Sequence, residues 1–470
     1  MRSATSLVAP LAFCAVLGAQ SPIRPDAAPA ADPAPAPSRF DEAWDAAPEG
    51  SSLGRRLKHV PLLSGDRAWV TFGLTARLRV SDTRSFLFSS APAMDDSFVE
   101  WRMSPSADAW VGRRNAWHLR AFAELRDAQA LGRSLPGGAR PSDADRTDWQ
   151  DLFAELGHGP NGLRVGRQDV ALGRERLVGL SDWANARRAF EGVRGSFSRG
   201  RLQITAFGGR VVEVRVREAN RPDATSHLRF ASATRSGAAP ISASWRLAGW
   251  QAYVIGDEQQ SGLVERLTTG GRLWGDRRGK SIEWSGEVEA ASQTGSIGAR
   301  SLRAWFAVAE GGATWYRARW TPSLTAGVDV GSGTGPDSAT RAGTFAPPYA
   351  TAHAFNGIAD VFGRGNLLER RLGVGARPRP ALQLFVVARH FSRVRTEDGV
   401  YSKANAVLRP TPGLSVRSVA DEVDLTARWN VSPRLRVEGG GAWVGAGDFI
   451  KATGSAAPIR WMFLSTSLAF

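Results

Sequence analysis

The stretch of sequence that decides the fold is residues 162–197, GLRVGRQDVALGRERLVGLSDWANARRAFEGVRGSF. Asn161 and Gly162 open it with a pair that favours a hairpin turn. Seven arginines then alternate with apolar residues at spacings that suit strands: Arg164, Arg167, Arg174, Arg176, Arg187, Arg188 and Arg194. A dry core could not hold so many guanidinium groups, because each would need a polar partner. The stretch therefore predicts strands with one wet face, either a solvated surface or the interior of a large barrel.

The composition of the whole chain limits the class of protein. Its 470 residues suffice for several ordinary domains or for one large barrel. Lysine and arginine number 60 against 45 acidic residues, which gives a formal net charge of +15. GC-rich coding is one explanation for the preference for arginine over lysine, but it does not explain where the arginines lie. Because no zinc-finger spacing, basic-region heptad or aromatic RNA-binding motif accompanies the charge, we expect no nucleic-acid partner.

The N-terminal region is predicted to be a leader followed by a tether. Residues 1–19 have the pattern of a secretory signal peptide, with Arg2 before an apolar run and Ala19 at the expected cleavage site. Cys14 is the only cysteine, so the mature chain would contain neither disulfides nor thiolate metal sites. Residues 20–58 are rich in proline and alanine and are expected to form an extended periplasmic tether.

From residue 59 onward the chain shows the two-residue period of strands. In Trp69–Val80 every second residue is apolar, whereas Arg77 and Arg79 fall on the opposite face. An arginine that faces lipid at mid-depth costs about 2–4 kcal/mol, so these two side chains should face a lumen. Other segments alternate in the same way, and they place Arg120, Arg126, Arg215 and Arg371 on polar faces.

These alternating segments, separated by loops, predict an all-β fold. No apolar run after the leader is long enough for a membrane-spanning helix, so a membrane protein of this kind would span as a closed barrel. Alternating segments of about ten residues are typical of a transmembrane antiparallel β-barrel of the outer-membrane type. Long loops are expected at residues 132–147, 221–240 and 331–348, which are rich in glycine, proline and polar residues.

The arginine-rich stretch also resembles a known family. The run Arg164-x-Gly-Arg-Gln-Asp169 followed by Trp183-Ala-Asn-x-x-Arg-x-Phe190 is similar to the signature of the alginate-export family of outer-membrane proteins. Residues 58–62, 352–372 and 447–454 resemble further segments of that family. The resemblance implies a barrel of about 18 strands over residues 59–470 in the cell outer membrane. The final segment, WMFLSTSLAF, resembles a barrel assembly signal, and this implies recognition of Phe470 by the barrel assembly machinery.

The clear alternating segments alone leave one inconsistency. If the barrel starts in the periplasm, they place the tight turn at Asn161-Gly162 outside the cell, where loops are usually long. An additional strand within residues 81–110, near Phe98–Met103, would remove the inconsistency.

The arginines are the candidate functional residues. Fixed positive charge in a lumen concentrates anions, and guanidinium groups pair with carboxylates in a bidentate way. With the family resemblance, this predicts passive passage of an anionic, alginate-like polysaccharide or of small anions. The predicted pore-lining residues are Arg77, Arg79, Arg120, Arg126, Arg164, Arg167, Arg174, Arg176, Arg187, Arg188, Arg194 and Arg371. The alternative for any of them is an ion pair that only braces the wall, with Glu124, Asp169, Glu175, Asp182 or Glu191 as partner.

Other functions have weaker support in the sequence. A general anion-selective porin would fit the same fold, and an outer-membrane enzyme is a third possibility. The histidines are scattered and no nucleophile elbow or phosphate loop is present, so we expect no enzyme activity, cofactor or metal. Asp143, Asp145 and Asp148 could bind Ca²⁺ but lack the pattern of an EF-hand, which favours a solvated acidic loop. Expected partners are outer-membrane lipid and periplasmic export components.

Overall fold

A computed structural model describes residue 36, residues 38–42, residue 44, residues 56–63 and residues 67–470, apart from residues 241–245, 352, 354 and 412. The expected signal peptide and Cys14 lie outside the described residues. Of the expected tether, only residues 36, 38–42, 44 and 56–58 are described.

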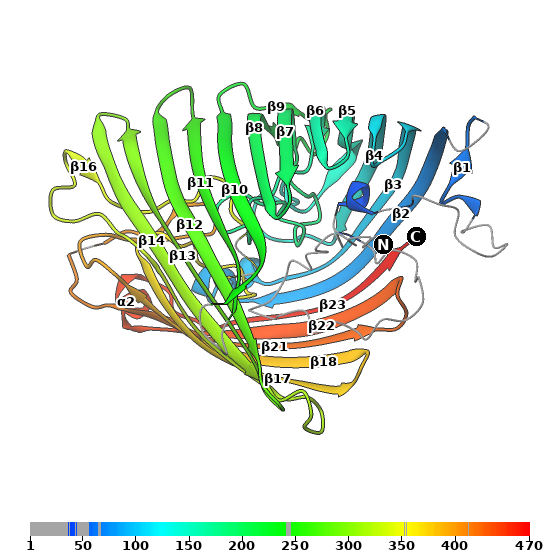
Figure 1. Ribbon diagram of the computed structural model, residues 1–470. Helices are drawn as coiled ribbons and strands as arrows, with labels where there is room; N and C mark the ends of the chain where they lie inside the picture. The colour runs from blue at the N-terminus through cyan, green and yellow to red at the C-terminus, as the bar shows by residue number, and fades with distance from the viewer. Residues whose placement is uncertain are drawn as a thin grey trace.

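Within the described residues, eighteen long strands form one closed antiparallel barrel (Figure 1). The first nine are β2 (Ala68–Arg84), β3 (Asp96–Gly112), β4 (Trp117–Leu131), β5 (Asp145–His158), β6 (Asn161–Gln168), β7 (Phe190–Arg199), β8 (Leu202–Glu213), β10 (His227–Pro240) and β11 (Arg246–Gln259). The others are β12 (Val264–Arg278), β13 (Glu283–Ile297), β14 (Arg300–Thr314), β15 (Ser323–Gly331), β17 (Leu367–Arg379), β18 (Leu382–Arg393), β21 (Ser418–Asn430), β22 (Leu435–Ala446) and β23 (Ile459–Ala469). Each pairs with the next, and β23 pairs with β2 to close the barrel, with Val80 opposite Leu464. The predicted all-β barrel is therefore confirmed.

Short elements lie in the connections between the long strands. They are η1 (Arg39–Asp41), β1 (Val60–Pro61), η2 (Phe86–Phe88), η3 (Pro92–Met94), β9 (Arg221–Pro222), β16 (Arg341–Ala342), β19 (Val400–Tyr401), β20 (Val407–Arg409) and α2 (Asp448–Thr453). In the described part of the chain, no helix is long and apolar enough to cross a membrane.

The two faces of the strands differ as their alternation predicts. On β2, Leu78 and Val80 are 51% and 49% exposed, whereas Arg79 between them is 5% exposed. On β4, Trp117 and Leu119 point outward and Arg120 points inward. An apolar outer face is stable only against lipid, and the charged inner face needs partners inside the barrel.

Strand β3 resolves the inconsistency in loop orientation. It lies where an additional strand was expected, and with it the turn at residues 159–160 falls at the same end as both termini of the barrel. That end also has the short turns 113–116, 200–201 and 380–381, whereas the long connections 169–189, 332–366 and 394–417 lie at the other end. Short turns mark the periplasmic end and long loops the extracellular end. β3 was hard to see because Phe98 and Trp110 face inward while Ser97 and Pro105 face outward.

Two expectations about local structure were wrong. Most of the loop expected at residues 221–240 is strand β10, in which Leu228 and Phe230 face inward and Arg229 faces outward, so the usual polarity is reversed. Conversely, β8 ends at Glu213, so Arg215 lies in a loop, where it pairs with Glu218, and not on a lumen-facing strand.

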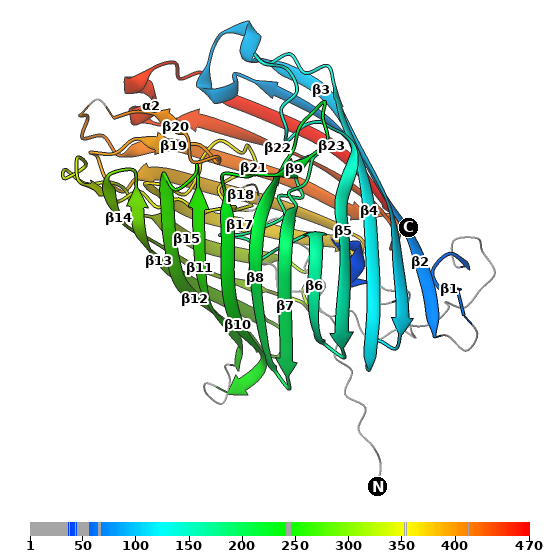
Figure 2. The ribbon, with the colours of Figure 1, turned by 90° about the horizontal axis from the view of Figure 1, so that it is seen from above.

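The long loops fold into the barrel (Figures 1 and 2). Residues 169–189, here called the signature loop, contribute Val170, Leu172, Leu177 and Val178 to a buried cluster. The cluster also contains Phe207 and Phe306 from the wall and Phe345 from the loop 332–366. The apolar contacts fix the signature loop inside the lumen, so the lumen is narrowed by packed protein.

Candidate functional site

The site is the constriction formed by the signature loop. Arg174, Arg176, Arg187 and Arg188 lie in this loop and not in strands, which corrects the extended arrangement that their spacing suggested. Left-handed backbone conformations at Gly173 (φ 57°), Glu175 (φ 61°) and Ser181 (φ 54°) turn the chain and interrupt the two-residue period. Arg164 and Arg167 are on β6 and Arg194 is on β7, as expected of strands.

Arg187 is the centre of a buried charge cluster at the end of this loop. Its Nη2 lies 2.8 Å from Asp169 Oδ2, 3.5 Å from Glu124 Oε1 and 3.7 Å from Asp151 Oδ2. Its Nη1 lies 3.7 Å from Asp182 Oδ1, and the side chain is 6% exposed. Burial alone would lower the pKa of Arg187, but the surrounding carboxylates raise it above its ordinary value. The cluster joins both ends of the loop to strands β4 and β5.

The Trp-Ala-Asn motif is held against strands β2 and β3. Arg77 donates to the carbonyls of Asp182 (2.8 Å) and Ala184 (3.0 Å), and Arg79 donates to the carbonyl of Trp183 (2.8 Å). The fully buried Asn185 donates through Nδ2 to three backbone carbonyls, each at 3.0 Å. The motif therefore acts as an anchor of the loop, because it satisfies polar groups of the wall that would otherwise be buried without partners.

Trp183 is held from the other side by aromatic groups. Its ring stacks on His353 of the loop 332–366 with a centroid distance of 3.9 Å, and it meets Phe463 of β23 edge-on at 4.9 Å. The indole ring thereby joins the loop 332–366 to β23.

A second ion-pair cluster fixes the middle of the signature loop to the far wall. Arg176, which is fully buried, pairs with Glu287, with Glu289 at 2.7 Å and with Glu310 at 3.0 Å. Arg174 lies 3.6 Å from both Glu287 and Glu310, and Arg371 also pairs with Glu310. The negative charge of these glutamates is thus shared among several arginines.

Most other predicted pore-lining arginines also brace the wall. Arg120 pairs with Asp108 at 2.7 Å, Arg164 with Glu155 at 2.6 Å and Arg167 with Glu191 at 2.7 Å. Arg79 pairs with Glu100, and Arg126 pairs with Asp145. These arginines therefore fit the alternative of ion pairs that brace the wall. Of the partners expected for such pairs, Glu124, Asp169, Asp182 and Glu191 do pair with arginines. Glu175 differs, because it accepts hydrogen bonds from Thr351 and from the backbone of Leu180.

Three of the predicted arginines differ from the others. Within the part of the chain that the structure describes, Arg77 and Arg188 donate only to carbonyl and amide oxygens, including Gly179 O at 2.7 Å from Arg188. Arg194 faces Arg164 across the β6–β7 pair and makes no hydrogen bond or ion pair with any residue in the described ranges. Burial lowers the pKa of Arg188 to about 10, so it still carries its charge at neutral pH. Carboxylates act on these three arginines only from beyond ion-pair distance: Asp182 and Glu100 on Arg77, Glu175 on Arg188, and Asp41 and Glu155 on Arg194. Because none of the three forms an ion pair within the described residues, we call Arg77, Arg188 and Arg194 the uncompensated arginines.

The sequence did not predict that the N-terminal segment enters the barrel. Phe40 is 3% exposed and packs edge-on against Phe122 and Phe153, while Ser38 Oγ donates to Asp169 at 2.6 Å. The carboxylate of Asp41 interacts electrostatically with Arg164 and Arg194. These described residues of the expected tether therefore lie inside the lumen, where Ser38 reaches the signature loop, and are not free chain. A phenylalanine at the end of a Pro/Ala-rich run was the only signal available.

The aspartates weighed as a calcium site are used otherwise. Asp143 pairs with Arg133 and Arg140, and Asp145 pairs with Arg126. Asp148 accepts from the backbone of Asn220 and pairs with Arg167. The described part of the chain contains no group of histidine, cysteine or acidic residues arranged to hold a metal ion. Asp143 and Asp145 are buried, so the expected solvated loop was also wrong for these two.

Comparison with known proteins agrees with this architecture. The fold of the Pseudomonas aeruginosa protein OpdP is similar, with a TM-score of 0.59, 11% identity and coverage of 88% of this chain and 93% of that one. OpdK, solved with vanillate, has a TM-score of 0.58 at 11% identity (85% and 98% covered). OpdF, solved in complex with glucuronate, has a TM-score of 0.57 at 13% identity (85% and 96% covered); both are from the same organism. No curated protein sequence matches.

The match to a family model covers most of the barrel. The model described as alginate export matches residues 68–463, from the first long strand to within the last. Together with the closed barrel, this places the protein in the outer membrane as a porin-like channel. The chain belongs to the alginate-export family.

Proposed function

We propose that this channel passively passes anionic solutes with carboxylate groups, including an alginate-like polyuronate, and that the uncompensated arginines select them. The observation that carries the proposal is that Arg77 and Arg188 beside the signature loop, and Arg194 on β7, form no ion pair with any described residue. Fixed positive charge inside a low-dielectric wall raises the local anion concentration and repels cations. The proposed transport involves no covalent step, so no enzyme activity or cofactor is needed.

The neutralised arginines have a different role in this proposal. The positive charge of Arg176 or Arg187 is matched by carboxylates beside it, and the guanidinium group already binds these carboxylates. Arg194 retains all its donors, so it can bind a carboxylate in the bidentate geometry that guanidinium groups favour. Few and separated contacts also suit a polymer, which has to leave each contact in order to move on.

The solved structures supply a second line of support. OpdF was crystallised with glucuronate, which is a single uronate unit, and its barrel has a similar fold. A general porin for small anions remains the second candidate, and the neighbour solved with vanillate favours it. Both candidates predict anion selectivity, and they differ in whether a polymer enters.

The test is a planar-bilayer recording of the refolded protein. We expect a reversal potential that shows anion preference in a KCl gradient, and block of the current by oligo-uronate. R188Q and R194Q should each move the reversal potential toward zero and weaken the block. R84Q is the matched control, because Arg84 lies on the outward face, is 51% exposed and pairs with Asp82.

The outcomes separate the candidates. Anion preference without oligomer block would favour the small-anion porin. Cation preference in the wild-type protein, or the same shift in R84Q as in R194Q, would refute the role of the uncompensated arginines. Recognition of Phe470 by the assembly machinery and contact with periplasmic export components stay predictions.

A further inference from the structure

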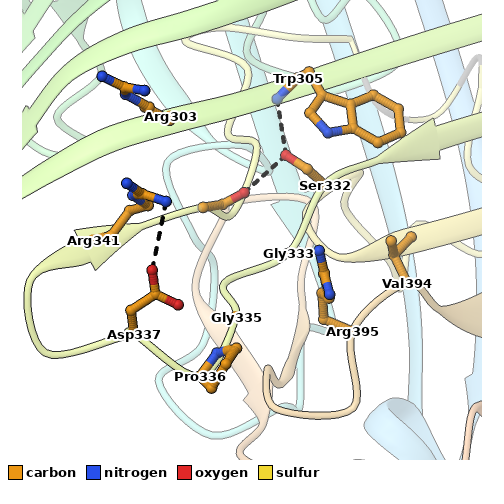
Figure 3. A pocket seen from close by; sticks show the side chains of 11 residues that line it. Arg303, Trp305, Ser332, Gly333, Gly335, Pro336, Asp337, Arg341, Val394 and Arg395 are labelled. Carbon is orange, nitrogen blue, oxygen red and sulfur yellow. Dashed lines mark hydrogen bonds and ion pairs between the residues drawn. The ribbon is translucent and has the colours of Figure 1, made fainter.

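A cavity of about 360 Å³ lies at the extracellular end of β14, away from the constriction (Figure 3). Three segments form it: Arg303 and Trp305 of β14, residues 332–343 of the long loop with Asp337 and Arg341, and Val394 and Arg395 after β18. β14 begins at Arg300, directly after the turn 298–299, and that turn belongs to the end with the long loops. The cavity is therefore at the level of the outer leaflet.

The cavity opens on the lipid side of the wall. Leu302, Ala304 and Phe306 are buried and face the lumen, so the intervening Arg303 and Trp305 face outward. Trp305 is 47% exposed. An outward tryptophan near a strand end is typical of the interface between acyl chains and headgroups. A charged group beside it would meet lipid headgroups and not the translocated solute.

The cavity walls are held by hydrogen bonds. The backbone N–H of Trp305 donates to Ser332 Oγ at 2.8 Å, and the Ser332 hydroxyl donates to the carbonyl of Gly343 at 2.8 Å (Figure 3). β16 pairs in parallel with β14, which places Arg341 opposite Ser301. The loop that carries Arg341 is thus fixed to the wall.

The lining carries excess positive charge. It contains three guanidinium groups and one carboxylate. The carboxylate belongs to Asp337, which lies 3.5 Å from Arg341 and pairs with that residue. The side chains of Arg303 and Arg395 make no hydrogen bond or ion pair with any residue that the structure describes. Basic pockets beside membrane-spanning segments can bind the charged headgroups of lipids. A guanidinium group whose N–H donors have no protein partner can bind phosphate oxygens in a bidentate geometry.

We propose that this cavity binds a phosphate group of the phosphorylated glycolipid that surrounds the barrel in the outer leaflet, with Arg303 and Arg395 as ligands. Trp305 would contact the adjoining sugar or the first part of an acyl chain. The volume holds a phosphorylated sugar unit, whereas the acyl chains would lie along the exposed apolar face of the neighbouring strands. Binding would fix the loop 332–366, which also contacts the signature loop through Trp183 and His353.

The experiment is native mass spectrometry of the refolded full chain with bisphosphorylated lipid A and with the same lipid after removal of both phosphates. We expect one tightly bound copy of the phosphorylated lipid and about tenfold weaker binding or more when both arginines are removed in R303A/R395A. R319A is the matched control, since Arg319 is an exposed arginine beside Trp320 at the periplasmic end, where no such cavity is proposed.

Each result decides the proposal. Equal binding of the dephosphorylated lipid would overturn it, as would equal loss in R319A and in the double variant. Competition by millimolar inorganic phosphate, without any lipid adduct, would identify a free-anion site at the channel mouth and would also overturn lipid binding. Because both arginines are exposed and unpaired, the double variant should fold, which resistance to unfolding in sample buffer at room temperature checks.

Discussion

Replacing Arg187 by glutamine should release the signature loop from the wall. Arg187 is 6% exposed and lies within 3.7 Å of carboxylate oxygens of Asp169, Glu124, Asp151 and Asp182. Removing one partner of a buried ion pair costs about 3–5 kcal/mol, because the other charge remains buried without compensation. Several carboxylates are left here, so we expect a loss at the upper end of that range.

The loss should appear as a change in both conductance and selectivity. Mutual repulsion of the remaining carboxylates disfavours the docked loop, so single-channel current should become larger and noisier in R187Q. The same change adds net negative charge to the constriction, so the reversal potential in a KCl gradient should move toward cation preference. Limited proteolysis should cut residues 169–189 faster than in the wild-type protein.

Two further variants test the reasoning. D169N/R187Q removes one of the carboxylates that the loss of Arg187 leaves without a partner, so it should restore part of the docking of the signature loop. R215Q is the control, since Arg215 forms an exposed pair with Glu218 in a loop and its loss should cost at most about 1 kcal/mol. If R187Q had the same conductance, selectivity and cleavage rate as R215Q, the cluster would not hold the loop.

Three other predictions concern Phe40, Asp182 and Leu78. F40A removes a 3% exposed ring from the lumen, so conductance should rise and anion preference should increase as Asp41 leaves Arg164 and Arg194. The arginines around Asp182 hold the pKa of that carboxyl below its usual range despite burial. The charged carboxylate therefore stabilises the docked loop at every pH above the pKa of an ordinary aspartate, and this stabilisation is lost as the pH falls below that pKa. Protease resistance of the loop should therefore persist from pH 8 to 5 and fall only below about pH 4, whereas in D182N it should be low throughout. L78R should destabilise the barrel by about 2–4 kcal/mol in a lipid refolding titration, because Leu78 is 51% exposed to the bilayer, and equal stability would contradict the outward assignment.

The barrel was predictable because its strands repeat a short-range physical rule. Arg79 between Leu78 and Val80 shows which face meets lipid, and the same pattern on β4 shows it again. The rule fails where the barrel interior is packed and not wet. β10 has Leu228 and Phe230 facing inward, where they pack in one cluster with the signature loop, so it lacks the usual polarity and its segment was expected to be a loop.

The site was predictable only in part, because its pairs join residues far apart in the chain. Arg176 pairs with Glu287, Glu289 and Glu310, which lie on strands of the far wall, and no spacing in the sequence indicates these contacts. The sequence placed arginines in the lumen, but it could not show which ones have a carboxylate beside them. Burial of Phe40 depends likewise on Phe122 and Phe153, which belong to different strands.

The arginines that contact the signature loop differ from Arg194 in what their replacement should change. The residues that identify the family fix the signature loop: Asn185 satisfies backbone carbonyls, and Arg187 binds the carboxylates around it. A variant of these residues changes whether the constriction forms. A variant of Arg194, which makes no such contact with a described residue, should change which ions the formed channel prefers. Two channels can therefore share the signature and differ in solute. The family match defines the barrel and its loop, whereas the solute has to be identified by measuring the selectivity that the uncompensated arginines produce.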